Sequence, residues 1–322
     1  MPSSITPITS GLLLLLAAAS VVAPDERTAR LEAEVERIGR EERLERAARA
    51  YAGACAACHG TTGRGDGPGA ADLVPPPRDF TTGGFRFRST PSGAPPRNED
   101  LVRTIREGLP GSSMPAFGGL LADEQIAELA ELVRSMAPPR EPVDPVPLAA
   151  LPPADSDTVR EGHALYLLLE CWRCHGLDGE GRGPASRGLT DTSGRPVRAT
   201  DFRHDPLKGG RDPLAVARAL LTGLDGTPMP SYGEALVFAR EDVAQPAVLD
   251  ERLSPAARNA LDEFLGTLPT RADLGELDQD GRGKLGARRL AALSHYVLSL
   301  DRRRSAGSWL FHQRPEREAR KR

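Results

Sequence analysis

The 322-residue sequence predicts a helical protein that is built from two repeated units. The segments with regular apolar spacing have the period of an α-helix, and the two halves of the chain carry the same motifs in the same order. A proline-rich stretch lies between these halves. The 33 glycines and 29 prolines predict that loops make up much of the rest. The net charge of −3 argues against a strong attraction to nucleic acid.

The chain begins with an uncharged, apolar segment. Residues 2–24 carry no charge, residues 11–19 are mostly Leu and Ala, and Val21-Val22-Ala23 resembles a secretory cleavage site. No basic segment precedes the apolar run, so an uncleaved membrane anchor is the alternative, although the run is short for a bilayer span. Both versions predict a location in the periplasm or another extracytoplasmic space. The second version adds membrane association through the N-terminus.

Composition and repeats divide the chain into six segments. Residues 25–46 are rich in Glu and Arg, with Leu31, Val35 and Ile38 at near-helical spacing, which predicts a charged helix. Seven prolines within residues 138–153 exclude a helix and predict an extended spacer. The segments are 1–24, a signal peptide or membrane anchor; 25–46, the charged helix; 47–137, the first unit; 138–156, the Pro-rich linker; 157–301, the second unit with an insertion at 236–286; and 302–322, a basic C-terminal tail.

Each unit contains one C-x-x-C-H-G motif, which includes the attachment sequence of a covalent c-type haem. In this motif the two cysteines bond to the vinyl groups of the porphyrin, and the histidine becomes an axial ligand of the iron. The four cysteines of the chain all lie in these two motifs. The motif residues are Cys55, Cys58 and His59 in the first unit, and Cys171, Cys174 and His175 in the second.

C-x-x-C pairs also occur in redox disulfides and in zinc sites. A thioredoxin-like disulfide site requires a βαβ context, which the surrounding sequence lacks. Two pairs that share one zinc ion are normally about 15–20 residues apart, whereas these pairs are 116 residues apart (171 − 55). The sequence therefore predicts two covalently attached haem c groups.

A ladder of glycines follows each histidine. It reads H-G-x-x-G-x-G-x-G-P in both units and ends at Pro68 and at Pro184. Glycines at this density let the backbone turn tightly and lie close to a flat ligand. We expect the carbonyl groups of Pro68 and Pro184 to accept the Nδ1 proton of the ligating histidine, a contact that fixes the ring and its tautomer.

A second shared motif, G-L-x-G-x-x-M-P-x-aromatic-G, places one methionine in each unit. Met114 lies 55 residues after His59 (114 − 59), and Met229 lies 54 residues after His175 (229 − 175). A single loop methionine is often only a gap-filler, but two at equivalent positions favour a shared role. Thioether sulfur is a suitable sixth ligand for haem iron, and it raises the reduction potential. The predicted iron ligands are therefore His59, Met114, His175 and Met229.

Helices of similar placement are predicted in both units. A short helix follows the cap candidates Asn98 and Asp212, and Asp123 opens the helix that closes the first unit. Two apolar stripes compete for the closing position of the second unit. The stripe of Leu290, Leu293, Val297 and Leu300 is favoured over the one in residues 254–265, and this choice makes residues 236–286 an insertion.

The chain resembles a di-haem c-type cytochrome made of two class I cytochrome c domains. The resemblance rests on both C-x-x-C-H-G motifs and both M-P-x-aromatic-G loops. The resemblance covers residues 47–137 and 157–301. It implies an all-α fold, with a few short helices and long loops around each haem, and electron transfer between redox proteins. The family often has a glycine and an aromatic residue before the first cysteine. In the first unit these positions hold Ala47, in place of the glycine, and Tyr51. In the second unit they hold Gly162 and Tyr166, but Tyr166 lies one residue further from its motif than Tyr51 does.

Closed coordination at both irons favours an electron carrier, or the cytochrome subunit of a respiratory or dehydrogenase complex, with no catalytic residue of its own. A di-haem enzyme of the peroxidase or thiosulfate-oxidising type is the alternative, and it requires one exchangeable axial position. Redox proteins are the expected partners. Arg78, Arg86 and Arg88 are candidates to pair with haem propionates, with simple surface placement as the alternative.

Overall fold

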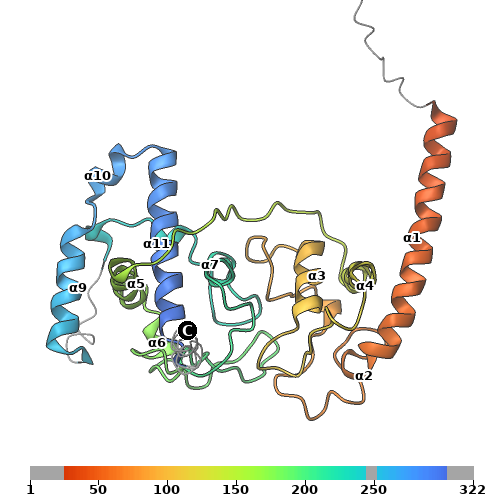
Figure 1. Ribbon diagram of the computed structural model, residues 1–322, viewed down its shortest axis with the longest axis horizontal. Helices are drawn as coiled ribbons and strands as arrows, with labels where there is room; N and C mark the ends of the chain where they lie inside the picture. Colours follow the sequence, from red (N-terminus) through yellow and green to blue (C-terminus); the bar gives the residue numbers. More distant parts are fainter. Residues whose placement is uncertain (1–24, 244–251, 303–322) are drawn as a thin grey trace, which may run out of the picture. The chain divides into compact units, whose positions relative to one another are not determined.

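The computed structural model describes residues 25–243 and 252–302. Within these ranges the regular structure is helical and no strand occurs, so the all-α prediction is confirmed (Figure 1). None of the described helices is long and apolar enough to cross a bilayer. The signal peptide or anchor expected at residues 1–24 lies outside the described residues, and so does the tail beyond residue 302.

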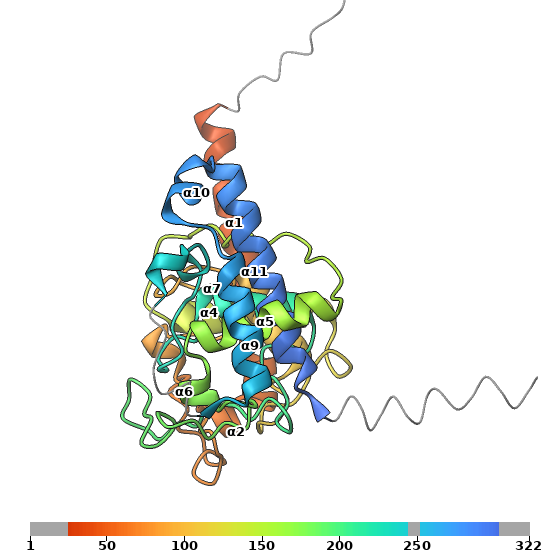
Figure 2. The ribbon, with the colours of Figure 1, turned by 90° about the vertical axis from the view of Figure 1, so that its left-hand side faces the viewer.

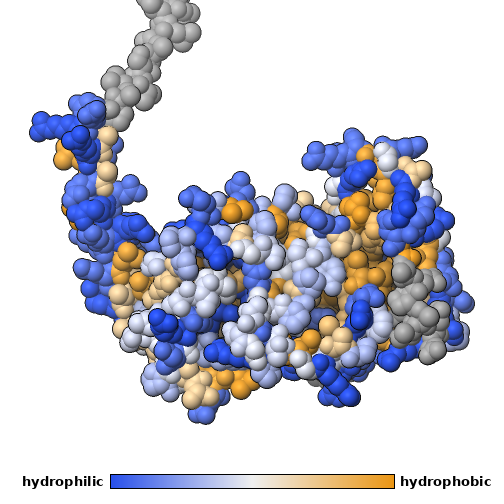
Figure 3. Space-filling model, turned by 180° about the vertical axis from the view of Figure 1, so that it is seen from behind, coloured by the Kyte–Doolittle hydropathy of each residue, from blue (hydrophilic) through white to orange (hydrophobic). Residues whose placement is uncertain are grey.

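The charged segment near the N-terminus forms a helix that continues up to the first cysteine motif. α1 spans Glu26–Ala54 and ends directly before the first cysteine motif. Its N-terminal part is nearly all exposed and mostly hydrophilic (Figure 3), and Arg37 forms ion pairs of 2.6 Å with Glu34 and Glu41. Its last turns contribute buried side chains, among them Tyr51, to the first unit.

The first unit consists of short helices and long loops around its cysteine motif. Its elements after α1 are α2 (Ala56–His59), the 3-10 helix η1 (Phe80–Thr82), α3 (Asn98–Glu107) and α4 (Asp123–Met136). α3 packs against α4. One core joins these helices to the end of α1, and its members include Tyr51, Phe80, Leu101, Ile105, Ile126 and Leu129.

The second unit repeats this plan and adds further helices. Its elements are α5 (Ser156–Leu168), α6 (Trp172–His175), α7 (Pro213–Thr222), the 3-10 helices η2 (Glu234–Leu236) and η3 (Arg240–Asp242), α9 (Pro255–Thr267), α10 (Arg271–Glu276) and α11 (Gln279–Ser299). α7 begins as the sequence predicts, because the Asp212 side chain accepts from the Ala215 N–H and Pro213 is the first helical residue. α3 differs, since Arg97 rather than Asn98 is its N-cap.

α11 is the helix that crosses α5, the helix leading into the second cysteine motif (Figure 2). Leu290, Leu293 and Val297 lie buried on α11. A side chain at Gly162 on α5 would collide with the Ala292 carbonyl oxygen of α11, so the glycine permits the two backbones to touch. α9 also packs against α5, which places part of segment 236–286 on the same helix.

The proline-rich linker carries no helix or strand from residue 138 to residue 155. It is hydrogen-bonded to both units: the Val146 N–H donates to the Ser89 carbonyl (2.8 Å), and the Pro152 carbonyl accepts from His295 Nε2 (2.8 Å). These two hydrogen bonds attach the linker to both units, although most of its residues are exposed, and Figure 1 shows it as an extended segment.

Two candidate haem sites

Each cysteine motif folds as one turn of helix. The His59 N–H donates to the Cys55 carbonyl and the His175 N–H donates to the Cys171 carbonyl, both at 2.9 Å. Residues three and four apart face the same side of such a turn, so both cysteines and the histidine of each motif are presented together. This is the arrangement that attachment of one porphyrin requires.

The four cysteines are free thiols rather than disulfides. Burial raises the pKa of Cys55 to about 11 and that of Cys171 to about 12, so these thiols stay protonated at neutral pH. Among the described residues no group of three or more potential ligands gathers to hold a metal ion on its own. Free, partly buried thiols in a helical turn fit thioether attachment of haem c.

A backbone carbonyl fixes each histidine ring, but it is not the carbonyl that the sequence suggested. His59 Nδ1 donates to the Arg78 carbonyl and His175 Nδ1 donates to the Thr200 carbonyl, both at 3.1 Å. Burial lowers the pKa of both histidines, which keeps the rings neutral. With the proton on Nδ1, the Nε2 atom of each ring has the free lone pair that an iron ion binds.

The assignment of this role to Pro68 and Pro184 is therefore wrong, and the glycine ladder gives the reason. The ladder folds back onto its own helical turn, as in the Gly65 N–H bond to the His59 carbonyl (2.9 Å). A later segment then passes beside it: a Cβ at Gly65 would lie 2.6 Å from the Pro77 carbonyl oxygen. Glycine at this place lets the Arg78 carbonyl reach the ring. The second unit repeats the arrangement, with Gly181 beside Ala199.

An aromatic ring stacks on each histidine, a contact that the sequence did not reveal. The ring centroids of His59 and Phe80 are 4.5 Å apart, and those of His175 and Phe202 are 4.3 Å apart, with the planes within 20° of parallel. Each phenylalanine is held to the ladder, since its N–H donates to the carbonyl of Gly63 or Gly179 at 2.7 Å. The shared Asp-Phe dipeptide in the two halves was the available signal.

A tyrosine before each motif binds the carbonyl that follows the histidine. The Tyr51 hydroxyl donates to the Gly60 carbonyl (2.8 Å), and the Tyr166 hydroxyl donates to the Gly176 carbonyl (2.6 Å). The extra residue before the second motif does not break this equivalence, because Glu170 takes a left-handed conformation (φ 58°) next to the motif. Both tyrosines therefore anchor the motif in the same way.

The two methionine loops have the same conformation. The Leu109 N–H donates to the Met114 carbonyl and the Leu224 N–H donates to the Met229 carbonyl, both at 3.1 Å. A hydroxyl inside each loop, from Ser112 or Thr227, accepts from the methionine N–H at 3.2 Å. Both methionines are partly buried, and each packs against the core cluster of its own unit, where Cys55 or Cys171 also packs.

The three candidate arginines have different surroundings. Arg88 is fully buried and bonded to Thr222 and Asp225 of the second unit, so it is not available to a propionate. Arg86 pairs with Asp191 at 3.2 Å, while its buried Nε has no partner. Burial, together with the charge of Arg86, lowers the pKa of Arg78 to about 10. A carboxylate would satisfy Arg86 Nε and stabilise both charges, so Arg78 and Arg86 fit haem propionates.

Comparisons with known proteins found matches to two families and to a solved structure. Residues 42–133 match the family described as "Cytochrome C oxidase, cbb3-type, subunit III", and residues 159–269 match the family described as "Cytochrome c". A chain of the Kuenenia stuttgartiensis reducing HAO-like protein complex is 32% identical, with a TM-score of 0.61, over 80% of this chain and 96% of that one. No curated protein sequence matches the chain.

Proposed function

The chain belongs to the c-type cytochromes with two cytochrome c domains, and we propose that it binds two haems with His/Met ligation and passes electrons between redox proteins. The proposed ligands are His59 and Met114 in the first domain, and His175 and Met229 in the second. The carrying observation is that both domains hold the same set of contacts on the histidine and the same methionine loop.

The described contacts support a rigid, closed iron site. When bound, each haem supplies an iron that exchanges one electron. The chain holds the histidine ring from two directions, through a carbonyl on Nδ1 and a phenyl ring on its face. Methionine loops that are hydrogen-bonded internally favour a ligand that stays in place in both oxidation states. Fixed ligands suit electron transfer, whereas catalysis at haem iron requires an open position.

We further propose that the protein works outside the cytoplasm and that its N-terminal segment is a secretion signal or an anchor. The uncharged residues 2–24 and the thioether chemistry of the two motifs support this proposal. Cell fractionation of a tagged full-length protein tests it. Recovery of the haem-loaded protein in the cytoplasmic fraction would rule it out.

A role as an electron-transfer subunit of a larger complex is the second candidate. One solved relative is a chain of a complex described as reducing and HAO-like. By that likeness, this chain would serve as the cytochrome component that supplies or accepts electrons for a separate catalytic subunit. Purification of the tagged protein from native cells, followed by identification of stoichiometric partners, distinguishes a subunit from a free carrier.

Carbon monoxide binding tests the proposed coordination. If both irons carry methionine, the fully reduced protein should bind carbon monoxide slowly or not at all at either haem. The Met229→Ala variant, which opens one axial position, is the positive control and should bind at once. Prompt binding by the wild-type protein at one haem would contradict the proposal and favour a di-haem enzyme.

A further inference from the structure

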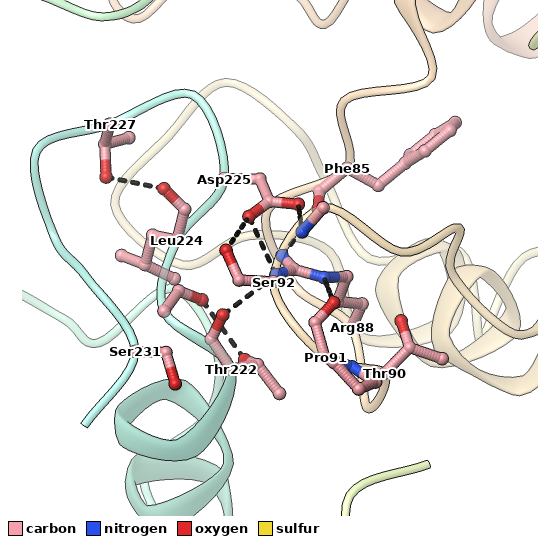
Figure 4. A network of polar contacts seen from close by, with 12 residues as sticks. Phe85, Arg88, Thr90, Pro91, Ser92, Thr222, Leu224, Asp225, Thr227 and Ser231 are labelled. Atoms are coloured by element: carbon pink, nitrogen blue, oxygen red, sulfur yellow. Dashed lines mark hydrogen bonds and ion pairs between the residues drawn. The ribbon is translucent and has the colours of Figure 1, made fainter. Parts of the chain in front are cut away.

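A buried arginine of the first domain is bonded to the methionine loop of the second domain. Arg88 lies in the loop between η1 and α3, and its side chain is 0% exposed. Its Nη2 atom donates to Asp225 Oδ1 at 2.7 Å and to the Thr222 carbonyl at 2.8 Å. Figure 4 shows the guanidinium between the two domains, pointing at both acceptors.

Residues of the first domain form the remaining hydrogen bonds of Arg88 and Asp225. Arg88 donates from Nε to the Pro91 carbonyl (3.1 Å) and from Nη1 to the Phe85 carbonyl (3.3 Å). Asp225 accepts, in addition, from the Ser92 hydroxyl and from the Gly93 N–H, both at 3.0 Å. The aspartate is therefore held by three donors of the other domain. Breaking such a buried, charged network is costly, because each group would remain desolvated without a partner.

Asp225 lies in the same turn as the proposed iron ligand. It lies four residues before Met229, inside the turn that the Leu224 N–H closes onto the Met229 carbonyl. The Thr227 hydroxyl donates to the Leu224 carbonyl (2.7 Å) and accepts from the Met229 N–H (3.2 Å). The other Arg88 acceptor, Thr222, is the last residue of α7, directly before this turn. Through its two acceptors, Asp225 and Thr222, Arg88 therefore restrains the loop that carries Met229.

The first methionine loop lacks this restraint. In the first loop, Pro110 occupies the position that corresponds to Asp225, so no equivalent ion pair can form. Among the described contacts the second domain meets this loop by packing, with Pro206 so close to Gly111 that a side chain at Gly111 would collide with it. The two loops share their internal geometry and differ in what holds them from outside.

We propose that Arg88 is a positioning residue for the second haem: through Asp225 it keeps the loop of residues 223–229 in the conformation that holds Met229 on the iron. The first domain thereby controls the sixth ligand of the second domain. This inference rests on the proposed His/Met ligation. It predicts that substitutions of Arg88 or Asp225 affect ligand binding at the second haem and not at the first.

Ligand exchange at each haem tests the inference. In the ferric holo protein, we expect the axial methionine methyl groups of the two haems to give separate upfield proton signals, which Met114→His and Met229→His variants assign and which imidazole binding removes. Imidazole is then titrated into the ferric wild type and into the Arg88→Gln and Asp225→Asn variants. Arg46→Gln is the matched control, since it removes an exposed ion pair of the first domain with Glu128.

Both test variants should bind imidazole at the second haem about tenfold more tightly than the wild type, the size expected for losing one charge-assisted hydrogen bond. The first haem and the control should be unchanged. Asp225→Asn, which keeps the shape of the partner, decides the question if Arg88→Gln does not fold. Unchanged affinity at the second haem, or an equal change at both haems, would overturn the inference. Absence of both methionine signals in the wild type would instead overturn the proposed ligation.

Discussion

At the scale of single residues, contacts within the chain itself fix the orientation of each proposed histidine ligand. One carbonyl holds the Nδ1 proton and one phenyl ring covers the imidazole face, in both domains and with nearly the same distances. A hydrogen bond on Nδ1 alone would leave the ring free to turn about that bond. The stack removes this freedom, so the orientation of Nε2 is set by contacts of the chain.

Removing the stacked phenyl ring is expected to destabilise each domain. Phe80 is a buried core residue, and replacement by alanine should lower the free energy of unfolding by about 3–5 kcal/mol, as for other large-to-small core changes. Chemical denaturation followed by haem absorbance measures this loss. Phe202 is only partly buried, so Phe202→Ala should cost less than Phe80→Ala, and Val74→Ala, at an 88% exposed position, should have little effect. An equal, small effect of all three changes would contradict the role assigned to the stack.

At the scale of secondary-structure elements, the backbones of α5 and α11 approach each other closely where the two helices cross. Gly162 permits this approach, since a side chain there would meet the Ala292 carbonyl and the Tyr296 Cβ. The helices continue the contact through rings: His163 stacks on Tyr296 with centroids 4.9 Å apart. The helix that leads into the second cysteine motif is thus held by α11.

Gly162→Ala should separate these helices. Overpacking at a close contact costs about 1–3 kcal/mol, and this cost should exceed the gain of replacing a helical glycine. Gly283→Ala is the matched control, because this α11 glycine has no heavy atom within 4 Å of a built Cβ, and it should stabilise by about 0.5–1 kcal/mol. Urea denaturation of both variants checks the signs. A stabilised Gly162→Ala would contradict the close approach.

The same crossing should make stability depend on pH. Burial lowers the pKa of His163 in the folded state below its ordinary value of about 6.5. The unfolded chain then binds the proton more readily, so this contribution to stability is complete above pH ~6.5 and decreases as pH falls from there through the lowered folded pKa. Urea midpoints at several pH values should show a weaker acid dependence for His163→Gln than for the wild type. If the urea midpoints of the two proteins depend on pH with the same slope, His163 does not cause the pH dependence.

At the scale of the whole molecule, the duplicated motifs made the fold and most of the candidate site predictable. Haem attachment requires two cysteines and a histidine at fixed spacing, and the loop of Met114, a proposed ligand, repeats its turn residues in the loop of Met229, so both features leave local patterns in the sequence. The His59 and His175 acceptors did not, since they lie 19 and 25 residues away and depend on the path of a loop. The Arg88 contacts join residues more than 130 positions apart, beyond any local pattern.

The intact mass of the mature protein, measured under denaturing conditions, shows how many haems are covalently attached. We expect the mass of the polypeptide plus two haems, with no thiol left to react with an alkylating reagent. Changing Cys171 and Cys174 to serine should remove one haem and leave the other. A mass equal to that of the bare polypeptide, or of the polypeptide with free thiols and one haem, would rule out two covalently attached haems.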